Sequence, residues 1–147
     1  MKIVENSTGK VEEMDLTLDK MLLYIRGGTV FARKDVARRS SSAMKYDPFT
    51  IVIAMNPDGE ARGYLYIDDG DSYDYKSELA FARIELSAKL NDQDKVLALK
   101  LDVTGQSSLL PDNILYANRI VLINPSESKE LPVELYFGKS KKYEFKL

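Results

Sequence analysis

Short runs rich in Val, Ile, Leu, Tyr and Phe alternate along the chain with residues that form tight turns. Gly27, Gly28, Gly59 and Gly70 stand between such runs, and glycine supplies the positive φ angles that many turns need. Many short strands with frequent turns are typical of antiparallel sandwiches. We therefore predict an all-β fold, an antiparallel β-sandwich. The predicted strands are residues 22–26, 29–32, 49–55, 62–67, 79–86, 96–101, 114–123, 133–137 and 143–147.

The apolar pattern differs between these runs, and the difference predicts where each strand lies. Tyr143, Phe145 and Leu147 alternate with charged residues, as a strand with one dry and one wet face requires. Residues 49–55 are apolar at nearly every position, which indicates a central strand covered on both faces. Residues 79–89 have a helix-forming composition, but the sandwich context favours a strand there.

Composition excludes several classes of function. With 44% hydrophobic and 30% charged residues the chain is ordinary globular protein, and its longest apolar run is strand-sized. We therefore expect no membrane partner. A formal charge of −2 gives no attraction for phosphate backbones, so we expect no nucleic acid. Histidine and cysteine are absent, which removes the commonest general base, thiol nucleophiles and most zinc ligands. No catalytic residue, metal site or cofactor is predicted.

The acidic run at residues 68–74 has three interpretations: a pair of glycosidase carboxylates, a calcium loop, or a hairpin turn. Glycoside hydrolysis needs two carboxyl groups about 5–9 Å apart across a sugar, whereas adjacent side chains at a strand end point to opposite faces. An EF-hand needs glutamate at its twelfth position, where Ala80 stands. The turn is favoured, with Asp68 and Asp69 capping local amides and Gly70 at positive φ.

Tyr64, Tyr66, Tyr73 and Tyr75 could form a platform for sugar, because aromatic faces bind the apolar faces of sugars. The spacing of Tyr64 and Tyr66 places both on one face of a strand. Ordinary packing between two sheets is the favoured interpretation, and a sugar contact stays the alternative.

Three segments in order resemble glycoside hydrolase family 31 α-glucosidases. They are Arg26-Gly27-Gly28-Thr29-Val30, the strand from Asp47 to Met55, and Gly63 to Tyr75 with its Asp-Asp-Gly turn. The stretch Arg38-Arg39-Ser40-Ser41 resembles the glucosidase II branch of that family.

The resemblance implies a region at the C-terminal end of the enzyme, packed on its (β/α)₈ barrel. Residues 1–46 would be the end of the proximal C-terminal β-domain, with a β-hairpin and a linker, and residues 47–147 the distal C-terminal β-sandwich. The family's nucleophile is an aspartate in a Trp-x-Asp-Met motif on the barrel. This chain has no tryptophan, so no catalytic residue is carried over to it.

The function expected from the resemblance is structural, in a region that is not itself an enzyme. The parent would remove α-linked glucose from N-glycans in the lumen of the endoplasmic reticulum. Its partners would be the catalytic barrel of the same chain and a regulatory subunit. The alternative is a carbohydrate-binding or subunit-docking module, which an exposed aromatic patch or groove would favour.

Overall fold

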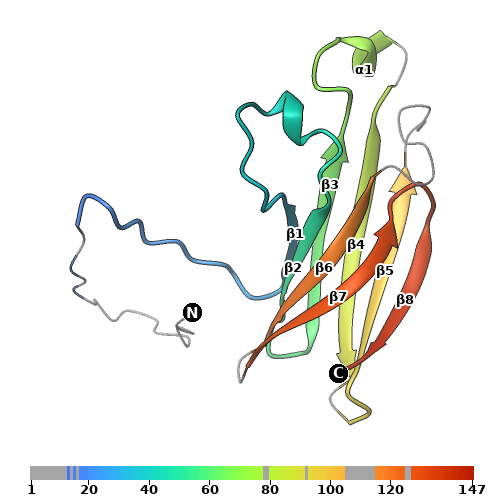
Figure 1. Ribbon diagram of the computed structural model, residues 1–147. Coiled ribbons are helices and arrows are strands. Elements are labelled where there is room, and N and C mark those ends of the chain that lie inside the picture. The colour runs from blue at the N-terminus through green and yellow to red at the C-terminus, as the bar shows by residue number, and fades with distance from the viewer. Residues whose placement is uncertain are drawn as a thin grey trace.

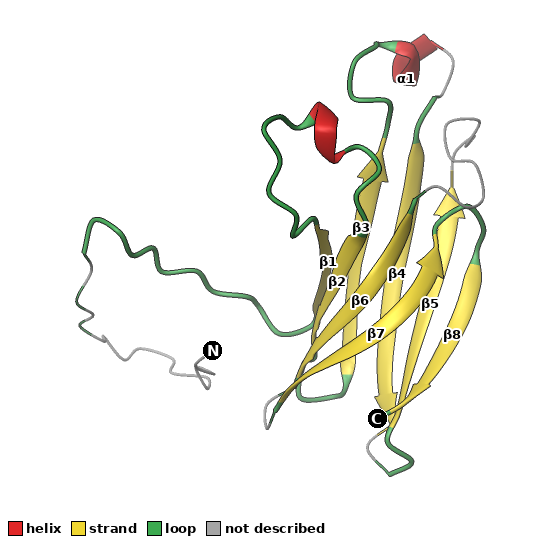
Figure 2. Cartoon of the chain, in the orientation of Figure 1, coloured by secondary structure: helices red, strands yellow, loops and turns green. Residues whose placement is uncertain are grey.

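The computed structural model describes residues 13, 15, 17–77, 80–91, 93–104, 115–124 and 127–147. Regular structure in these residues is almost all strand (Figure 2), which confirms the all-β prediction. Within these ranges no helix has the length and apolar character needed to cross a membrane. The elements are β1 (Thr29–Arg33), the 3₁₀ helix η1 (Ser42–Met44), β2 (Phe49–Ala54), β3 (Glu60–Ile67), α1 (Asp74–Ser77), β4 (Ala82–Asn91), β5 (Val96–Thr104), β6 (Tyr116–Ile123), β7 (Ser128–Tyr136) and β8 (Lys141–Lys146).

The strands form one sheet in the order β7-β6-β2-β1-β3-β4-β5-β8. The β1–β3 and β2–β6 pairs are parallel, and the other neighbouring pairs are antiparallel. The sheet curls so that β6 and β7 cross in front of β4 and β5 (Figure 1). A single hydrophobic cluster fills the space between these two halves. The curled sheet is thus consistent with the predicted sandwich, although mixed in direction.

In strands β2 and β4 the buried residues are the ones that the apolar pattern of the sequence predicts. Every residue of β2 is buried, as its continuous apolar run predicted. In β4, buried and exposed residues alternate almost perfectly, with Ile84 and Leu86 in the core and Arg83 and Glu85 outside. That period of two confirms the strand interpretation of this segment over a helix.

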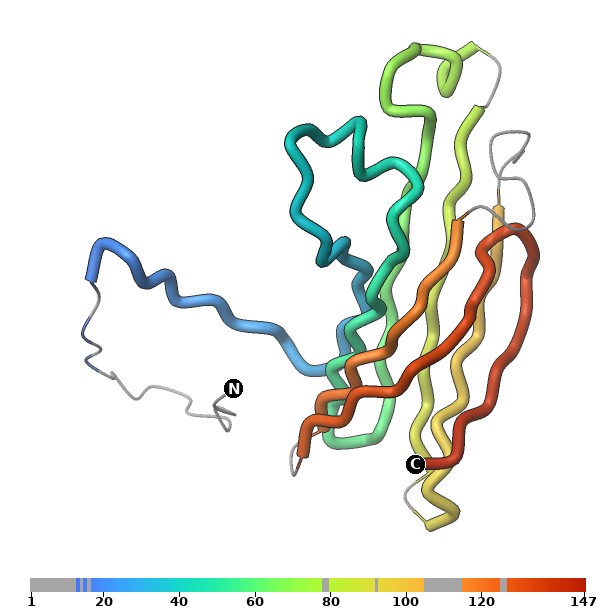
Figure 3. The backbone as a smooth tube through the Cα atoms, in the orientation of Figure 1, coloured from blue at the N-terminus to red at the C-terminus, as the bar shows by residue number. Residues whose placement is uncertain are grey.

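The predicted strand at residues 22–26 is wrong, and so is its pairing into a hairpin with residues 29–32. The segment has no regular structure and runs away from the sheet, as the tube in Figure 3 shows. Strand β1 instead lies between β2 and β3. Because a strand has only two hydrogen-bonding edges, and β2 and β3 occupy both edges of β1, the preceding segment has no edge left to pair with.

Both sheet edges carry features that discourage further pairing. Pro132 lies in edge strand β7, where a missing amide hydrogen is tolerated. The other edge, β8, carries outward lysines including Lys142 and Lys146. Charged residues on an edge oppose pairing with another chain.

At Gly63 the backbone of β3 comes very close to β1. A β-carbon built there would lie 1.7 Å from the carbonyl oxygen of Val30 in β1. Only a residue without a β-carbon allows β1 and β3 to pair at this distance, so the chain requires glycine at this position.

Candidate functional site

The acidic turn, residues 68–74, lies at one end of the sheet between β3 and α1 (Figure 1). The Asp68 carboxylate accepts a hydrogen bond of 3.0 Å from the amide of Gly70, whose φ is 77°. The Asp69 carboxylate accepts one of 3.1 Å from the amide of Ser72. Each carboxylate therefore closes its own local turn, the arrangement that aspartate commonly makes in turns.

The electrostatics of the acidic turn agree with this geometry. A hydrogen bond with the Ser72 side chain, and then bonds from local amides, hold the pKa of Asp69 below its usual range. Such a carboxylate stays ionised and is a poor proton donor. In the described part of the chain no three acidic side chains converge as metal ligands would. The arrangement stabilises the turn.

The other predicted turn glycines differ in their backbone demands. Gly28 has a φ of 85° and donates a hydrogen bond of 2.8 Å to the carbonyl of Ala54. Gly59 has a φ of 71° and donates one of 3.0 Å to the carbonyl of Asn56. Gly27 lacks positive φ, but a β-carbon there would lie 3.1 Å from a backbone oxygen.

Tyr64 and Tyr66 lie on the outer face of β3, the face turned away from the core, so their predicted packing between sheets is wrong. Their exposed fractions are 65% and 45%. The reason is the strand's alternation: Leu65 packs against the core, and its neighbours must point the other way. Tyr66 stacks on Phe81 with ring centroids 5.6 Å apart and planes at 22°, and the Arg83 guanidinium lies 5.1 Å from the Tyr64 centroid.

Tyr73 and Tyr75 flank this surface on the acidic turn and α1. Their ring centroids lie 6.2 Å apart, and the Lys76 ammonium lies over both rings. Burial raises the pKa of the Tyr66 hydroxyl, and Asp68 raises it further through its charge and a hydrogen bond. Asp68, which directly follows β3, therefore lies within hydrogen-bonding reach of the Tyr66 hydroxyl.

A groove of about 280 Å³ lies on the same outer face, farther along β3 and β4. Arg62, Ser87, Lys100 and Lys142 face one another across four strands in register, and all four line the groove. Two of its cations are paired on their own strands: Lys100 with Asp102 at 2.7 Å and Lys142 with Glu144 at 2.8 Å. Charged side chains therefore line the groove, and acidic partners offset the charges of Lys100 and Lys142.

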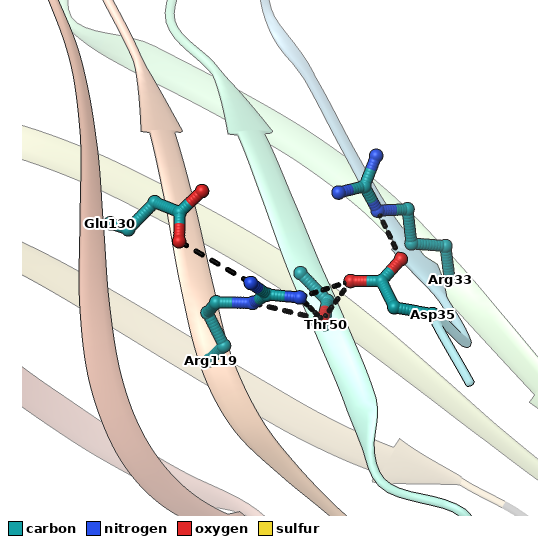
Figure 4. Close-up of polar contacts among 5 residues, drawn as sticks. All are labelled: Arg33, Asp35, Thr50, Arg119 and Glu130. Atoms are coloured by element: carbon teal, nitrogen blue, oxygen red, sulfur yellow. Dashed lines mark hydrogen bonds and ion pairs between the residues drawn. The ribbon is translucent and has the colours of Figure 1, made fainter.

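A polar network that the sequence did not indicate lies on the outer face of β1, β2, β6 and β7 (Figure 4). Asp35 lies at its centre, 2.8 Å from Nε of Arg33 and 2.5 Å from Nη2 of Arg119. The hydroxyl of Thr50 also donates to Asp35, at 2.7 Å. Arg119 reaches Glu130 with its other terminal nitrogen at 3.3 Å.

A bulge in β6 aims Arg119 into this network. The register of β6 with β7 shifts between Ala117 and Arg119, so one extra residue separates the inward Ala117 from the inward Ile120. If strict alternation continued from Ala117 with no bulge, Arg119 would point into the core. The bulge thus places the guanidinium outside, between the carboxylates of Asp35 and Glu130.

Each charged side chain of the polar network is paired with another member of the network, which favours a structural role. Burial acts to raise the pKa of Asp35, but the Thr50 hydrogen bond and the charges of Arg33 and Arg119 outweigh it and hold the pKa below its usual range. The Arg119 guanidinium also occupies the space between the two carboxylates (Figure 4). A sugar could not lie there as a glycosidase mechanism requires.

Comparisons with known proteins find similarity to α-glucosidases over part of the chain. No protein-family profile matches the chain. A segment of 68 residues, 46% of the chain, is 46% identical to a probable glucan 1,3-alpha-glucosidase of Arabidopsis thaliana and covers 7% of that protein. A segment of 74 residues, 50% of the chain, is 45% identical to the glucosidase 2 subunit alpha of Saccharomyces cerevisiae and covers 8% of it.

The fold has a solved counterpart in the same enzymes. In a crystal structure of the ER glucosidase II heterodimeric complex, 15% of one chain matches 83% of this chain with a TM-score of 0.55 and 25% identity. The resemblance to family 31 α-glucosidases, and to the glucosidase II α subunit among them, is confirmed over part of the chain. The aligned segments make up less than a tenth of the curated relatives' length.

Proposed function

We propose that this chain is a non-catalytic, C-terminal β-region of a larger α-glucosidase, and that it stabilises the parent by packing against the catalytic barrel. The apolar segment, residues 18–24, carries the proposal. Met21 and Leu23 are exposed to 84% and 80%, and the segment runs away from the sheet (Figure 3). Exposed apolar side chains in a continuous stretch mark an interaction surface. The rest of the parent enzyme is the partner that we propose.

The division of the parent follows from the resemblance. In this proposal residues 1–46 end the proximal C-terminal β-domain and residues 47–147 form the distal β-sandwich. Strand β1 pairs with β2 and β3, so the proximal region would contribute one strand to the distal sheet. The apolar segment precedes that strand within the proximal region, and in this proposal it docks beside the barrel.

The parent's activity and surroundings are also part of the proposal. By likeness to the glucosidase II α subunit, the parent would hydrolyse α-linked glucose on N-glycans in the lumen of the endoplasmic reticulum. The solved counterpart is a heterodimer of a catalytic subunit and the binding domain of a regulatory subunit. A regulatory subunit is accordingly a proposed partner of the parent.

Substitution in the apolar segment of the parent enzyme tests the structural role. Leu23→Asp should lower soluble yield, while the molecules that fold keep their turnover per active site, measured by active-site titration. Val36→Asp is the matched control, because Val36 is also exposed but lies outside the segment. Normal yield with lost turnover would mean that the segment contributes to the catalytic pocket.

The chain alone should hydrolyse no chromogenic α-glucoside. Its two adjacent turn aspartates are bound to local amides, and its network carboxylates are bridged by arginine. Turnover that survives repurification and disappears in Asp68→Asn or Asp69→Asn would contradict the proposal.

A further inference from the structure

The outer face of β3 and β4 presents an aromatic strip, defined as Tyr64, Tyr66 and Phe81 with Arg83 beside them. Tyr64 and Tyr66 are two residues apart, so their Cα atoms lie about 7 Å apart on one face. Both remain substantially exposed. Exposed rings at this spacing leave apolar surface in water that a ligand could cover.

The rings of the strip are held in place before any ligand arrives. Tyr66 stacks on Phe81, and Arg83 covers one face of Tyr64 at 5.1 Å. The backbone beneath them is a continuous antiparallel ladder, in which Tyr64 faces Glu85 and Tyr66 faces Arg83. Side chains that are already ordered lose little entropy on binding, which favours affinity.

Polar groups surround the rings. Arg83 and Glu85 form only a loose ion pair at 3.8 Å and are half-exposed, so both retain hydrogen-bonding capacity. Asp68 lies beside the Tyr66 hydroxyl at one end of the strip. At the other end, along the same strands, the groove presents Arg62 and Ser87. Apolar faces with donors and acceptors at their edges match a pyranose ring, which has an apolar face and a rim of hydroxyls.

We propose that the aromatic strip and the adjoining groove form a binding site for a neutral oligosaccharide, with pyranose rings stacked on Tyr64 and Tyr66. The cations of the site have acidic neighbours: Arg83 lies 3.8 Å from Glu85, and Lys100 and Lys142 pair with carboxylates on their own strands. This charge balance favours a neutral ligand over a phosphate-bearing one. This site is independent of the structural role proposed above, since it lies on β3 and β4 and not on the apolar segment.

Titration of the full chain with maltohexaose, and separately with mannohexaose, tests the site. In ¹⁵N-labelled protein the amide shifts should move in β3 and β4 around Tyr64 and Glu85. Tyr64→Ala should raise the dissociation constant about three- to tenfold, the change that one aromatic contact is worth. Tyr64→Phe keeps the ring and should stay within about twofold.

Tyr46→Ala is the matched control, because Tyr46 is exposed to 64% but lies on the loop before β2, away from the strip. It should leave binding unchanged. Each variant's thermal unfolding midpoint shows whether it is folded. Failure of both sugars to shift β3 and β4 at millimolar concentration would overturn the proposal, as would Tyr64→Ala binding like the wild type. Protection of Tyr64 from surface labelling in the sugar-free parent enzyme would instead assign the strip to a neighbouring domain.

Discussion

Strand β2 and the apolar segment at residues 18–24 are both rich in apolar residues, yet their burial is opposite. Ile51 and Ile53 in β2 are fully buried, whereas Met21 and Leu23 are among the most exposed apolar residues. Strand β2 has β1 and β6 on its two edges, while no strand of the described residues pairs with the apolar segment. Apolar residues are therefore expected to pack against other residues, but their composition does not show which residues those are. In the function proposed above, the rest of the parent enzyme covers the segment.

The largest expected effect comes from a charge in β2. Ile53→Asp would bury a carboxylate without a partner, at a cost of several kcal/mol against a total stability of about 5–15 kcal/mol. The variant should be largely unfolded or insoluble, as judged by circular dichroism and urea denaturation. A free energy of unfolding within about 1 kcal/mol of wild type would contradict the burial of Ile53, and with it the difference between β2 and the apolar segment.

A smaller loss is expected where β1 meets β3. Gly63→Ala should destabilise the sheet by about 3 kcal/mol, because the new methyl group would overlap the Val30 carbonyl and force the strands apart. Gly70→Ala is the matched control, since nothing lies within 4 Å of its β-carbon position and only its positive φ opposes substitution. That conformational cost is about 1 kcal/mol. Urea denaturation of both variants gives the comparison, and a larger loss at Gly70 would contradict it.

Much of this fold could be predicted from the alternation of apolar and polar residues and from the turn residues. Both signals depend only on residues that are close together in the sequence. The period of two in β4 and the continuous apolar run of β2 reflect burial on one face or on both. The prediction of a strand at residues 22–26 was wrong, whereas the prediction of β2 was right, because only β2 has neighbouring strands on its edges. Whether an apolar run pairs depends on a neighbouring edge, and sequence pattern alone does not show which edges are occupied.

The candidate sites show the same limit. Asp35 and Arg119 are 84 positions apart, and a bulge in β6 decides which way Arg119 points. The requirement for glycine at position 63 could not be predicted, because the oxygen atom that excludes a β-carbon there belongs to another strand. For Tyr64 and Tyr66 the spacing correctly predicted a shared face, but only the assembled sheet shows that this face is the outer one.

Acidification should weaken the loop between β1 and β2, in which residues 34–47 lie. Asp35 contacts Arg33 and Arg119, and Asp47 pairs with Arg38 at 2.7 Å. Burial acts to raise the pKa of Asp35, but its hydrogen bond from Thr50 and its two arginines hold the value below the usual range. For Asp47, the hydrogen bond from Arg38 is the largest cause of its lowered pKa.

Because these folded-state pKa values lie below the unfolded ones, the stabilisation is present above about pH 4, the ordinary aspartate value. It is lost as the pH falls from there through the folded-state pKa values. Urea denaturation at pH 7 and at successively lower pH should show this loss, and Asp35→Asn should reduce it. If the free energy of unfolding fell equally with pH in the wild type and in Asp35→Asn, the polar network would not be the cause of the loss.

The smallest effect is expected from Leu23→Asp in the isolated chain, in contrast to the same substitution in the parent enzyme. Leu23 is exposed to 80%, so a carboxylate there remains in water and should change the free energy of unfolding by no more than about 0.5 kcal/mol. The added charge should also reduce self-association, which light scattering measures, because the exposed apolar segment loses part of its attraction for a second copy. A loss of stability comparable to that of Ile53→Asp would mean that the segment packs on its own sheet in solution, and the contrast with β2 would disappear.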